Sequence, residues 1–212
     1  MAYRPNDYYA RKAKTEKYAA RSVYKLKEID QKHHVFRKGA LVLDLGSSPG
    51  SWSQYAAEQI GPKGRILGVD LKRMEIALPN AVFLRKDINE LEFGPVLEEY
   101  EFTKPFDIVI SDMAPDTSSH RFTDQMRSLD LCETAFGVAY KMLRGGGHFV
   151  CKIFDSGEVQ NFKKDLMQYF SKVYTVRPKS VRSESKEVFI VAKFFKGRTS
   201  DKPVDETSEE QQ

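Results

Sequence analysis

Seven short runs of aliphatic, β-branched and aromatic residues recur between residues 40 and 195, and helical patterns separate most of them. The runs are ALVLDL (40–45), RILGVDL (65–71), AVFLRKD (81–87), FDIVISD (106–112), GHFVCKIF (147–154), KVYTVRP (172–178) and EVFIVAKFF (187–195). Helical patterns cover about 51–60, 123–143 and 158–170. Near-continuous apolar strands that alternate with helices are typical of a parallel sheet with both faces covered. We therefore predict an α/β fold around a mostly parallel, seven-stranded sheet with helices on both faces.

The last run differs from the others because only a short connection separates it from KVYTVRP. Short connections join antiparallel strands in hairpins, whereas parallel strands need a longer crossover. We expect the last strand to be antiparallel, so that Glu187 at its start reaches the edge where the earlier strands end.

The 212 residues suffice for one substantial core. We assign residues 1–38 to a basic N-terminal arm and helix of the same domain, 39–196 to its core and 197–212 to a disordered, acidic tail. The helix is expected at 15–33, where apolar and polar side chains occupy different sides. Its apolar positions are Val23, Leu26 and Ile29, and its polar positions are Arg21, Lys25, Glu28 and Lys32.

Charge is distributed unevenly along the chain. The first 38 residues contain eleven Lys and Arg against four Asp and Glu, and residues 201–212 contain five acids and one lysine. A basic arm favours a polyanionic partner, although composition alone is equally compatible with a solvated charged face. Six of the eleven cations cluster within the first 21 residues, with Tyr3, Tyr8, Tyr9 and Tyr18 interleaved for stacking or packing: Arg4, Arg11, Lys12, Lys14, Lys17 and Arg21.

Cys132 and Cys151 stand alone, and the chain has no CxxC motif or Cys/His cluster, so neither a disulfide framework nor a zinc site is indicated. We predict core thiols in a reducing compartment and no metal site. The N-terminus lacks an apolar signal region, and no run of 18 apolar residues occurs. We expect a cytoplasmic monomer without membrane association.

In an open parallel sheet, ligands bind outside the carboxyl ends of the strands. The predicted strands place small and polar residues there: Asp44, Gly46, Asp70, Asp87, Asp112, Lys152 and, from the antiparallel strand, Glu187. These residues should converge at one edge of the sheet.

The segment DLGSSPGSW (44–52) reads as a strand, a tight turn and the start of a helix, so its backbone can approach a ligand closely. It lacks a G-x-G-x-x-G pattern, and Pro49 removes a possible pyrophosphate donor, which disfavours a dinucleotide. Asp70 fits an acceptor for ribose hydroxyls, and Asp87 could meet an adenine amino group. Taken alone, either aspartate is more often a turn or helix cap.

Several motifs occur together in a fixed order: RSVYKLKEID, DLGSSPGSWSQY, GVDL, SDMAPD, CKIF and SKEV. In this combination, over about residues 7–195, the chain resembles the FtsJ/RrmJ family of S-adenosylmethionine-dependent ribose 2′-O-methyltransferases. The resemblance implies a Rossmann-like class I methyltransferase fold with S-adenosylmethionine as cofactor. It further implies a catalytic tetrad of Lys25, Asp112, Lys152 and Glu187, and cofactor contacts from Gly50, Trp52, Asp70, Asp87 and Asp112.

Methyl transfer to a ribose needs in-line alignment of the hydroxyl with the sulfonium methyl and help in removing the hydroxyl proton. A lysine is normally protonated, so Lys152 can act as a base only if burial or Lys25 disfavours its cation. Asp112 and Glu187 favour that cation. Lys152 therefore either accepts the proton or orients the hydroxyl and stabilises the developing alkoxide.

Two positions depart from the pattern of the family. Asp116 and TSSHRF follow SDMAP where the family commonly has asparagine and a small flexible loop, which bears on substrate contacts. Ser51 stands where glycine is frequent, and a helix N-terminus accommodates serine easily. SDMAP also differs from the D/N-P-P-Y motif of many amino-group methyltransferases, which favours oxygen as the acceptor.

The resemblance to the ribosomal RNA group implies a uridine ribose in large-subunit ribosomal RNA, within the subunit particle, as the substrate. Transfer RNA is the alternative substrate in the same family. Two readings from other classes are a nicotinamide-dependent oxidoreductase, opposed by the missing glycine pattern, and a non-enzymatic RNA-binding module, opposed by the complete tetrad.

Overall fold

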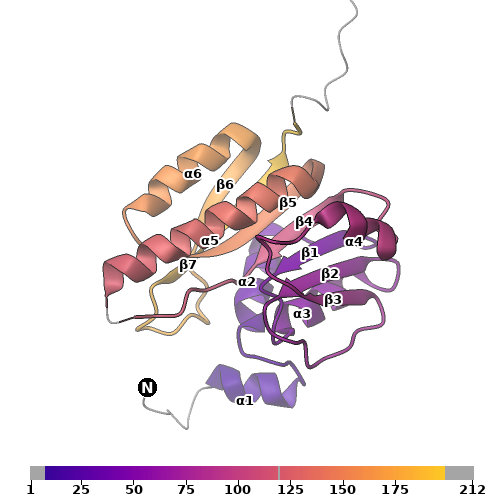
Figure 1. Ribbon diagram of the computed structural model, residues 1–212. Helices are drawn as coiled ribbons and strands as arrows, with labels where there is room; N and C mark the ends of the chain where they lie inside the picture. The colour runs from indigo at the N-terminus through magenta and orange to yellow at the C-terminus, as the bar shows by residue number, and fades with distance from the viewer. Residues whose placement is uncertain (1–7, 119, 199–212) are drawn as a thin grey trace, which may run out of the picture.

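The structure, a computed structural model, describes residues 8–118 and 120–198 (Figure 1). Its strands are β1 Leu41–Leu45, β2 Arg65–Asp70, β3 Ala81–Arg85, β4 Phe106–Ser111, β5 Leu143–Phe154, β6 Phe170–Val176 and β7 Glu187–Phe195. Its helices are α1 Tyr8–Thr15, α2 Val23–His33, α3 Ser51–Ile60, α4 Phe93–Glu99, α5 Arg121–Met142 and α6 Glu158–Tyr169.

All seven strands form one sheet in the order β3-β2-β1-β4-β5-β7-β6. The strands from β1 to β5 pair in parallel, and β7 lies between β5 and β6, antiparallel to both. This confirms the predicted α/β fold and the reversed direction of the last strand. Because β7 runs backwards, Glu187 at its start pairs with Phe154 at the end of β5.

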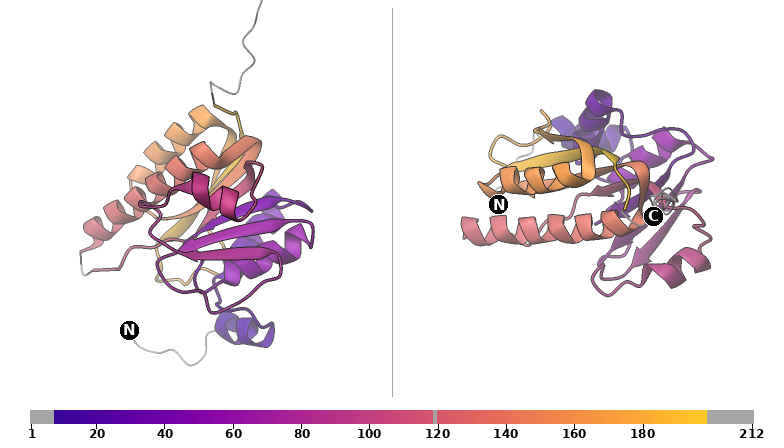
Figure 2. Two further views of the ribbon diagram at one scale, coloured as in Figure 1. Left: turned by 45° about the vertical axis from the view of Figure 1, so that its right-hand side comes forward. Right: turned by 90° about the horizontal axis from the view of Figure 1, so that it is seen from above.

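Each face of the sheet has its own core, because strand side chains alternate between the two faces. Leu43 and Val109 belong to a core that includes α5 and α6. Val42, Ile108 and Val150 belong to the core that includes α2 and α3. Figure 2 shows α5 and α6 on one face, with the N-terminal helices on the other.

The helix predicted at 15–33 is wrong in its first part, because α1 ends at Thr15 and α2 begins only at Val23. The chain turns between them at Lys17, which has a φ of 61°. Tyr18 N then donates to Ala13 O at 2.9 Å. The turn folds α1 back, so that Ala13 joins the core of α2.

The other three predicted helices agree with α3, α5 and α6 to within two residues at each end. The short helix α4 was not predicted, since Phe93 is the one buried residue among its seven. The strand β5 begins at Leu143, before the predicted run.

Parts of the predicted arm and tail, residues 1–7 with Tyr3 and Arg4 and residues 199–212, lie outside the described residues. None of the helices within 8–118 and 120–198 has both the length and the apolar content needed to cross a membrane.

Candidate active site

The polar residues at the strand ends continue an apolar stripe on one face of the sheet. Val42 and Val150 belong to the core beneath α2 and α3. Asp44 lies two residues beyond Val42, and Lys152 two beyond Val150. Since strand side chains alternate with a period of two, each polar residue shares the face of the apolar one before it. The site therefore forms where this stripe reaches the carboxyl edge of the sheet.

Lys152 is almost buried at this edge, with 8% of its side chain exposed. Its Nζ donates to the backbone carbonyl of Asp112 at 2.6 Å and lies 2.9 Å from Asp112 Oδ1. The second contact is an ion pair without hydrogen-bond alignment, so Oδ1 has no hydrogen-bond partner among the described residues. An ammonium has three N–H donors, so Lys152 can still donate to another acceptor.

Lys25 and Glu187 form a second ion pair, with 2.5 Å between Lys25 Nζ and Glu187 Oε2. Lys25 lies in the first turn of α2, and Ser185 Oγ donates to the other carboxylate oxygen of Glu187 at 2.9 Å. Burial raises the pKa of Glu187, but the charge and hydrogen bond of Lys25 and the charge of Lys152 outweigh burial and leave that pKa below its usual value. Glu187 is therefore held as a carboxylate.

The register of β5 and β7 brings the two ion pairs together. Lys152 pairs with Phe189 and Phe154 pairs with Glu187, so Lys152 and Glu187 project from the same face of neighbouring strands. Lys25 Nζ lies 5.9 Å from the centre of the Phe189 ring. The structure thus brings together all four residues predicted as the tetrad, and their catalytic roles stay a prediction.

The turn between β1 and α3 packs closely against its surroundings. Gly46 has a φ of 75°, and a Cβ there would lie 2.6 Å from Met113 Cγ. Gly50 has a φ of 112°, and a Cβ there would lie 2.3 Å from Ile76 Cδ1. Glycine avoids both the backbone strain and the clash. Neither position of the turn therefore has room for a side chain.

Asp70 supports this turn from the end of β2. Its Oδ2 accepts from Ser48 N at 2.9 Å, and its Oδ1 accepts from Lys72 N at 2.7 Å. Asp87, after β3, accepts from Asn89 N at 2.9 Å. Both aspartates therefore cap local turns. A carboxylate oxygen can accept more than one hydrogen bond, so this local role leaves each of them able to bind a ligand as well.

Trp52 holds the structure behind the turn together. Its side chain is buried, and Nε1 donates to Ser22 O at 3.0 Å. Ser51, the departure from the family pattern, is also buried, with its Oγ 2.8 Å from Ser22 Oγ. The indole has a single N–H, and Ser22 O already accepts from it. A hydrogen bond from Trp52 to a cofactor would therefore come from its backbone.

Asp44 was expected at this edge but was assigned neither a catalytic nor a cofactor-binding role. It is fully buried in β1, where Oδ2 accepts from Ser53 Oγ at 2.5 Å and Oδ1 has no hydrogen-bond partner within the described residues. Burial, aided by the charges of Asp112 and Asp70 and opposed by the Ser53 hydrogen bond, raises the pKa of Asp44 to about 7. The sequence feature that could have indicated a buried acid here is the aspartate inside the apolar run LVLDL.

A pocket of about 310 Å³ opens beside the turn, near Asp70. Its lining comes from the turn, the loop after β2 and β3: Ser47, Lys72, Arg73, Met74, Ile76, Ala77, Leu78, Ala81, Phe83, Leu84 and Arg85. Apolar side chains next to a carboxylate suit a flat ring joined to a sugar. Within the described part of the chain, no three His, Cys, Asp or Glu side chains gather so as to hold a metal ion.

The order of the sheet, the antiparallel β7 and the polar carboxyl edge define a Rossmann-like α/β methyltransferase. The family model of FtsJ-like methyltransferases matches residues 18–195. The chain belongs to this family, and the resemblance found in its motifs is confirmed.

Two curated relatives carry the name Ribosomal RNA large subunit methyltransferase E. The protein from Bdellovibrio bacteriovorus is 52% identical over 191 residues, which cover 90% of this chain and 97% of the relative. The protein from Oleidesulfovibrio alaskensis is 50% identical over 194 residues, which cover 90% of this chain and 92% of the relative.

A solved structure shares the fold. A crystal structure from Plasmodium falciparum, described as that of a ribosomal RNA methyltransferase, has a TM-score of 0.77 and 30% sequence identity. The match covers 85% of this chain and all of that chain.

Proposed function

We propose that this protein transfers the methyl group of S-adenosylmethionine to a ribose 2′-hydroxyl, that of a uridine in large-subunit ribosomal RNA. The observation that carries the proposal is the pair of ion pairs, Lys152 with Asp112 and Lys25 with Glu187, at the carboxyl edge of a methyltransferase fold. The names of relatives at about 50% identity support the choice of ribosomal RNA.

The residues at the edge fit S-adenosylmethionine. The proposed contacts are the backbone at Gly50 and Trp52, where α3 begins, and the carboxylates of Asp70, Asp87 and Asp112. Asp112 Oδ1 lacks a hydrogen-bond partner among the described residues and can accept from an ammonium or hydroxyl. When bound, this cofactor supplies an activated methyl group. We propose that Asp70 accepts from its ribose and Asp87 from its adenine.

Lys152 is the proposed contact to the target hydroxyl. One of its three N–H groups donates to the carbonyl of Asp112, and the carboxylate of Asp112 is an ion-pair partner without hydrogen-bond alignment, so a donor remains for the ribose oxygen. Two roles are compatible with this geometry: acceptance of the hydroxyl proton, or orientation of the hydroxyl and stabilisation of the developing charge. The Lys25–Glu187 pair lies beside Lys152, and the carboxylate of Glu187 interacts electrostatically with both lysines.

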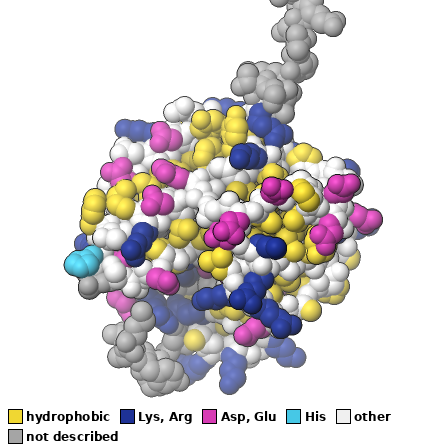
Figure 3. Space-filling model, in the orientation of Figure 1, with side chains coloured by type: hydrophobic (Ala, Val, Ile, Leu, Met, Phe, Trp, Pro, Cys, Tyr) yellow, Lys and Arg dark blue, Asp and Glu magenta, His cyan; other side chains and the backbone are white. Residues whose placement is uncertain are grey.

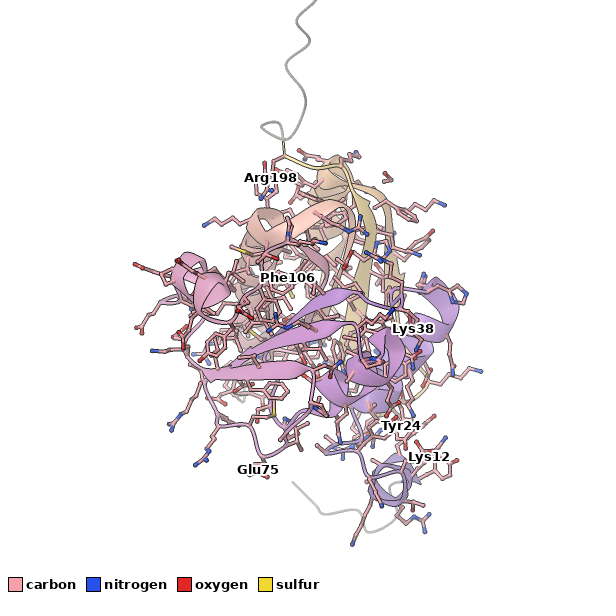
Figure 4. All side chains as sticks on the ribbon, turned by 90° about the vertical axis from the view of Figure 1, so that its right-hand side faces the viewer. Lys12, Tyr24, Lys38, Glu75, Phe106 and Arg198 are labelled. Carbon is pink, nitrogen blue, oxygen red and sulfur yellow. The ribbon has the colours of Figure 1, made fainter. Side chains whose placement is uncertain are left out.

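RNA binding is supported by a groove between α1 and α2, of about 610 Å³. It is lined by Tyr9, Lys12, Tyr24, Lys27, Glu28, Gln31, Lys32 and Lys179. Cations with interleaved aromatic rings suit phosphates and unstacked bases. Figure 4 shows Lys12 and Tyr24 at the same end of the molecule as Glu75, in the loop after β2. Figure 3 shows a dense group of Lys and Arg side chains in the lower half of the face towards the viewer.

The arm is proposed to be part of the methyltransferase domain, because Ala13, Val23 and Leu26 are buried in one core with Val42 of β1. We further propose a monomer that acts in the cytoplasm on large-subunit particles. Gel filtration of the purified protein tests the first point, and fractionation of cell extracts tests the second.

The function is tested by offering labelled methyl donor and the purified protein to three substrates: large ribosomal subunits from cells lacking the protein, naked ribosomal RNA and transfer RNA. We expect label on one ribose of a ribosomal substrate, mapped as a 2′-O-methyl group. Label on transfer RNA alone would overturn the substrate and keep the chemistry. Label on a base nitrogen would overturn the tetrad assignment.

A further inference from the structure

A second pocket, of about 390 Å³, lies next to the tetrad on the side away from the β1–α3 turn. It is lined by Thr117, Ser118, Arg121, Asp124, Gln125, Phe154, Glu184, Ser185 and Lys186. Its volume is in the range of small-ligand sites. It shares no lining residue with the pocket beside the β1–α3 turn.

Two contacts attach the pocket to the tetrad. Phe154 lies two residues beyond Lys152 and pairs with Glu187 across the β5–β7 ladder. Ser185 Oγ donates to Glu187 Oε1 at 2.9 Å. A ligand in this pocket therefore lies beside the carboxylate of Glu187.

The order of the strands fixes what lies on each side of the tetrad. Along the carboxyl edge, β2 with Asp70 comes first, then β1 and β4, then β5 with Lys152 and β7 with Glu187. In-line transfer requires the acceptor oxygen to approach the methyl group from the side opposite the sulfur. The target nucleotide must therefore extend from Lys152 away from Asp70, towards the second pocket.

The chemistry of ribose limits how far the base can be from Lys152. The base is bonded to C1′, the atom next to the C2′ that carries the reacting hydroxyl. A nucleotide with its 2′-oxygen at Lys152 consequently holds its base within a few ångströms of the tetrad. The pocket meets this requirement through two lining residues: Phe154, two positions beyond Lys152, and Ser185, whose Oγ donates to Glu187.

The lining suits a nucleobase. Phe154 offers a half-buried ring for stacking, and Gln125 has a fixed amide whose Nε2 donates to Asp155 O at 2.7 Å. Arg121 and Lys186 are exposed cations at the rim. Bases that are turned out of an RNA are typically held by an aromatic ring and polar edge groups, with cations on the phosphates.

One wall of the pocket is held in place before any ligand arrives. Asp124 is buried near the start of α5, and its carboxylate accepts from both the backbone N and the Oγ of Ser118 at 2.9 Å. The loop after β4 is thereby attached to α5. A wall that is already ordered costs less ordering entropy when a ligand binds.

We propose that this pocket receives the base of the nucleotide to be methylated, turned out of the RNA with its 2′-hydroxyl at Lys152. The inference rests on the proposed ribose methylation. Phe154 stacks on the base, Gln125 contacts its edge, and Arg121 and Lys186 face the neighbouring phosphates.

The first test compares Phe154→Leu with Phe194→Leu, which changes an exposed ring at the far end of β7. The substrate is large ribosomal subunits from cells lacking the protein. Phe154→Leu should lower kcat/KM for the subunits by about tenfold or more, with the cofactor dissociation constant unchanged, and Phe194→Leu should behave as wild type. Wild-type kcat/KM in Phe154→Leu would overturn the pocket assignment.

The second test needs no variant, so it is independent of any change that Phe154→Leu makes at Lys152. The wild-type protein is bound to the same subunits with S-adenosylhomocysteine and irradiated with short-wavelength ultraviolet light. The nucleotide that is methylated in the activity assay should crosslink to a peptide containing Phe154, Gln125 or Ser185. Its crosslinking elsewhere, or not at all, would overturn the inference. Absence of methyl transfer by the wild type would instead overturn the proposed function, and the inference with it.

Discussion

Lys25 and Glu187 lie 162 positions apart in the chain and form an ion pair of 2.5 Å. Two further contacts join α2 and the residue Arg21 just before it to the loop before β7. Arg21 Nη2 donates to Ser180 O at 2.6 Å, and Glu28 Oε1 accepts from Ser180 N at 2.9 Å. The N-terminal helix is therefore attached to the segment that ends in Glu187, and the ion pair is the contact nearest the site.

Removing Lys25 should therefore disturb both stability and activity. The side chains of Lys25 and Glu187 are 12% and 14% exposed, so Lys25→Ala leaves a largely buried carboxylate unpaired. We expect a loss of about 1–3 kcal/mol in the free energy of unfolding and a loss of methyl transfer of about tenfold or more. The control is Lys27→Ala on the same helix, whose partner Glu16 is 36% exposed. It should cost at most about 1 kcal/mol. Equal costs for the two variants in urea denaturation would contradict the role of the pair.

Lys152→Ala should nearly abolish methyl transfer and leave cofactor binding largely intact, because Lys152 is proposed to contact the substrate hydroxyl. Lys152→Arg keeps a positive charge and separates the two roles, since a guanidinium does not lose its proton at accessible pH. Single-turnover rates measure both variants, and calorimetry measures cofactor binding. Near-normal turnover by Lys152→Arg would rule out proton acceptance, and we expect that variant to be inactive.

Asp70→Ala should weaken S-adenosylmethionine binding by about 1–3 kcal/mol, the cost of leaving a polar partner unsatisfied. The turn also loses its hydrogen bond from Ser48 N to Asp70. Asp165→Ala, at an exposed position of α6, is the control and should bind the cofactor as the wild type does. Titration calorimetry on both proteins measures the difference. Wild-type affinity in Asp70→Ala would refute the cofactor assignment.

The difference in the free energy of unfolding between Asp44→Asn and the wild type should shift in favour of Asp44→Asn as the pH rises from 5 to 8. Burial raises the pKa of folded Asp44 to about 7, whereas the unfolded chain ionises it near pH 4. Between these values the folded chain binds more protons, so wild-type stability falls as the pH rises. The gain in Asp44→Asn should reach at most about 4 kcal/mol above pH 7. Denaturant titrations at both pH values measure it, and a pH-independent difference would contradict the prediction.

Asp107→Asn serves as a control of opposite sign. Burial raises the pKa of Asp107, but hydrogen bonds from Leu41 N, Arg144 and Arg37 outweigh burial and leave that pKa below its usual value. The stability from this carboxylate is present at neutral pH and is lost as the pH falls. Asp107→Asn should therefore be the less stable protein at pH 8, with the deficit shrinking in acid.

Lys12, Lys32 and Lys179 line the groove between α1 and α2, and together they are proposed to contact RNA phosphates. Changing all three to Gln should lower the slope of log K against log salt by about two for RNA binding, with cofactor affinity unchanged. The same changes at three exposed lysines outside the groove form the matched control: Lys104, Lys141 and Lys164. Filter binding over a salt series measures both sets. Equal slopes for the two triple variants would show that the groove does not contact RNA phosphates.

The sequence alone determined the class of fold and the place of the site. Hydrophobic runs of strand length, separated by helical patterns, admit few arrangements other than a covered parallel sheet. Strand patterning placed Asp112, Lys152 and Glu187 at one edge, and the resemblance to the FtsJ/RrmJ family implied that Lys25 acts with them. These inferences hold because local patterning and strand direction depend on residues near one another in the chain.

The tertiary structure decided how those residues are paired and what surrounds them. The sequence placed two lysines with two carboxylates, and only the packing of α2 on β7 joins Lys25 to Glu187 and leaves Lys152 to Asp112. The break at Lys17, the burial of Asp44 and the pocket at Phe154 were likewise absent from the prediction. Each depends on contacts between segments that are distant in sequence, and single-residue preferences carry little information about such contacts.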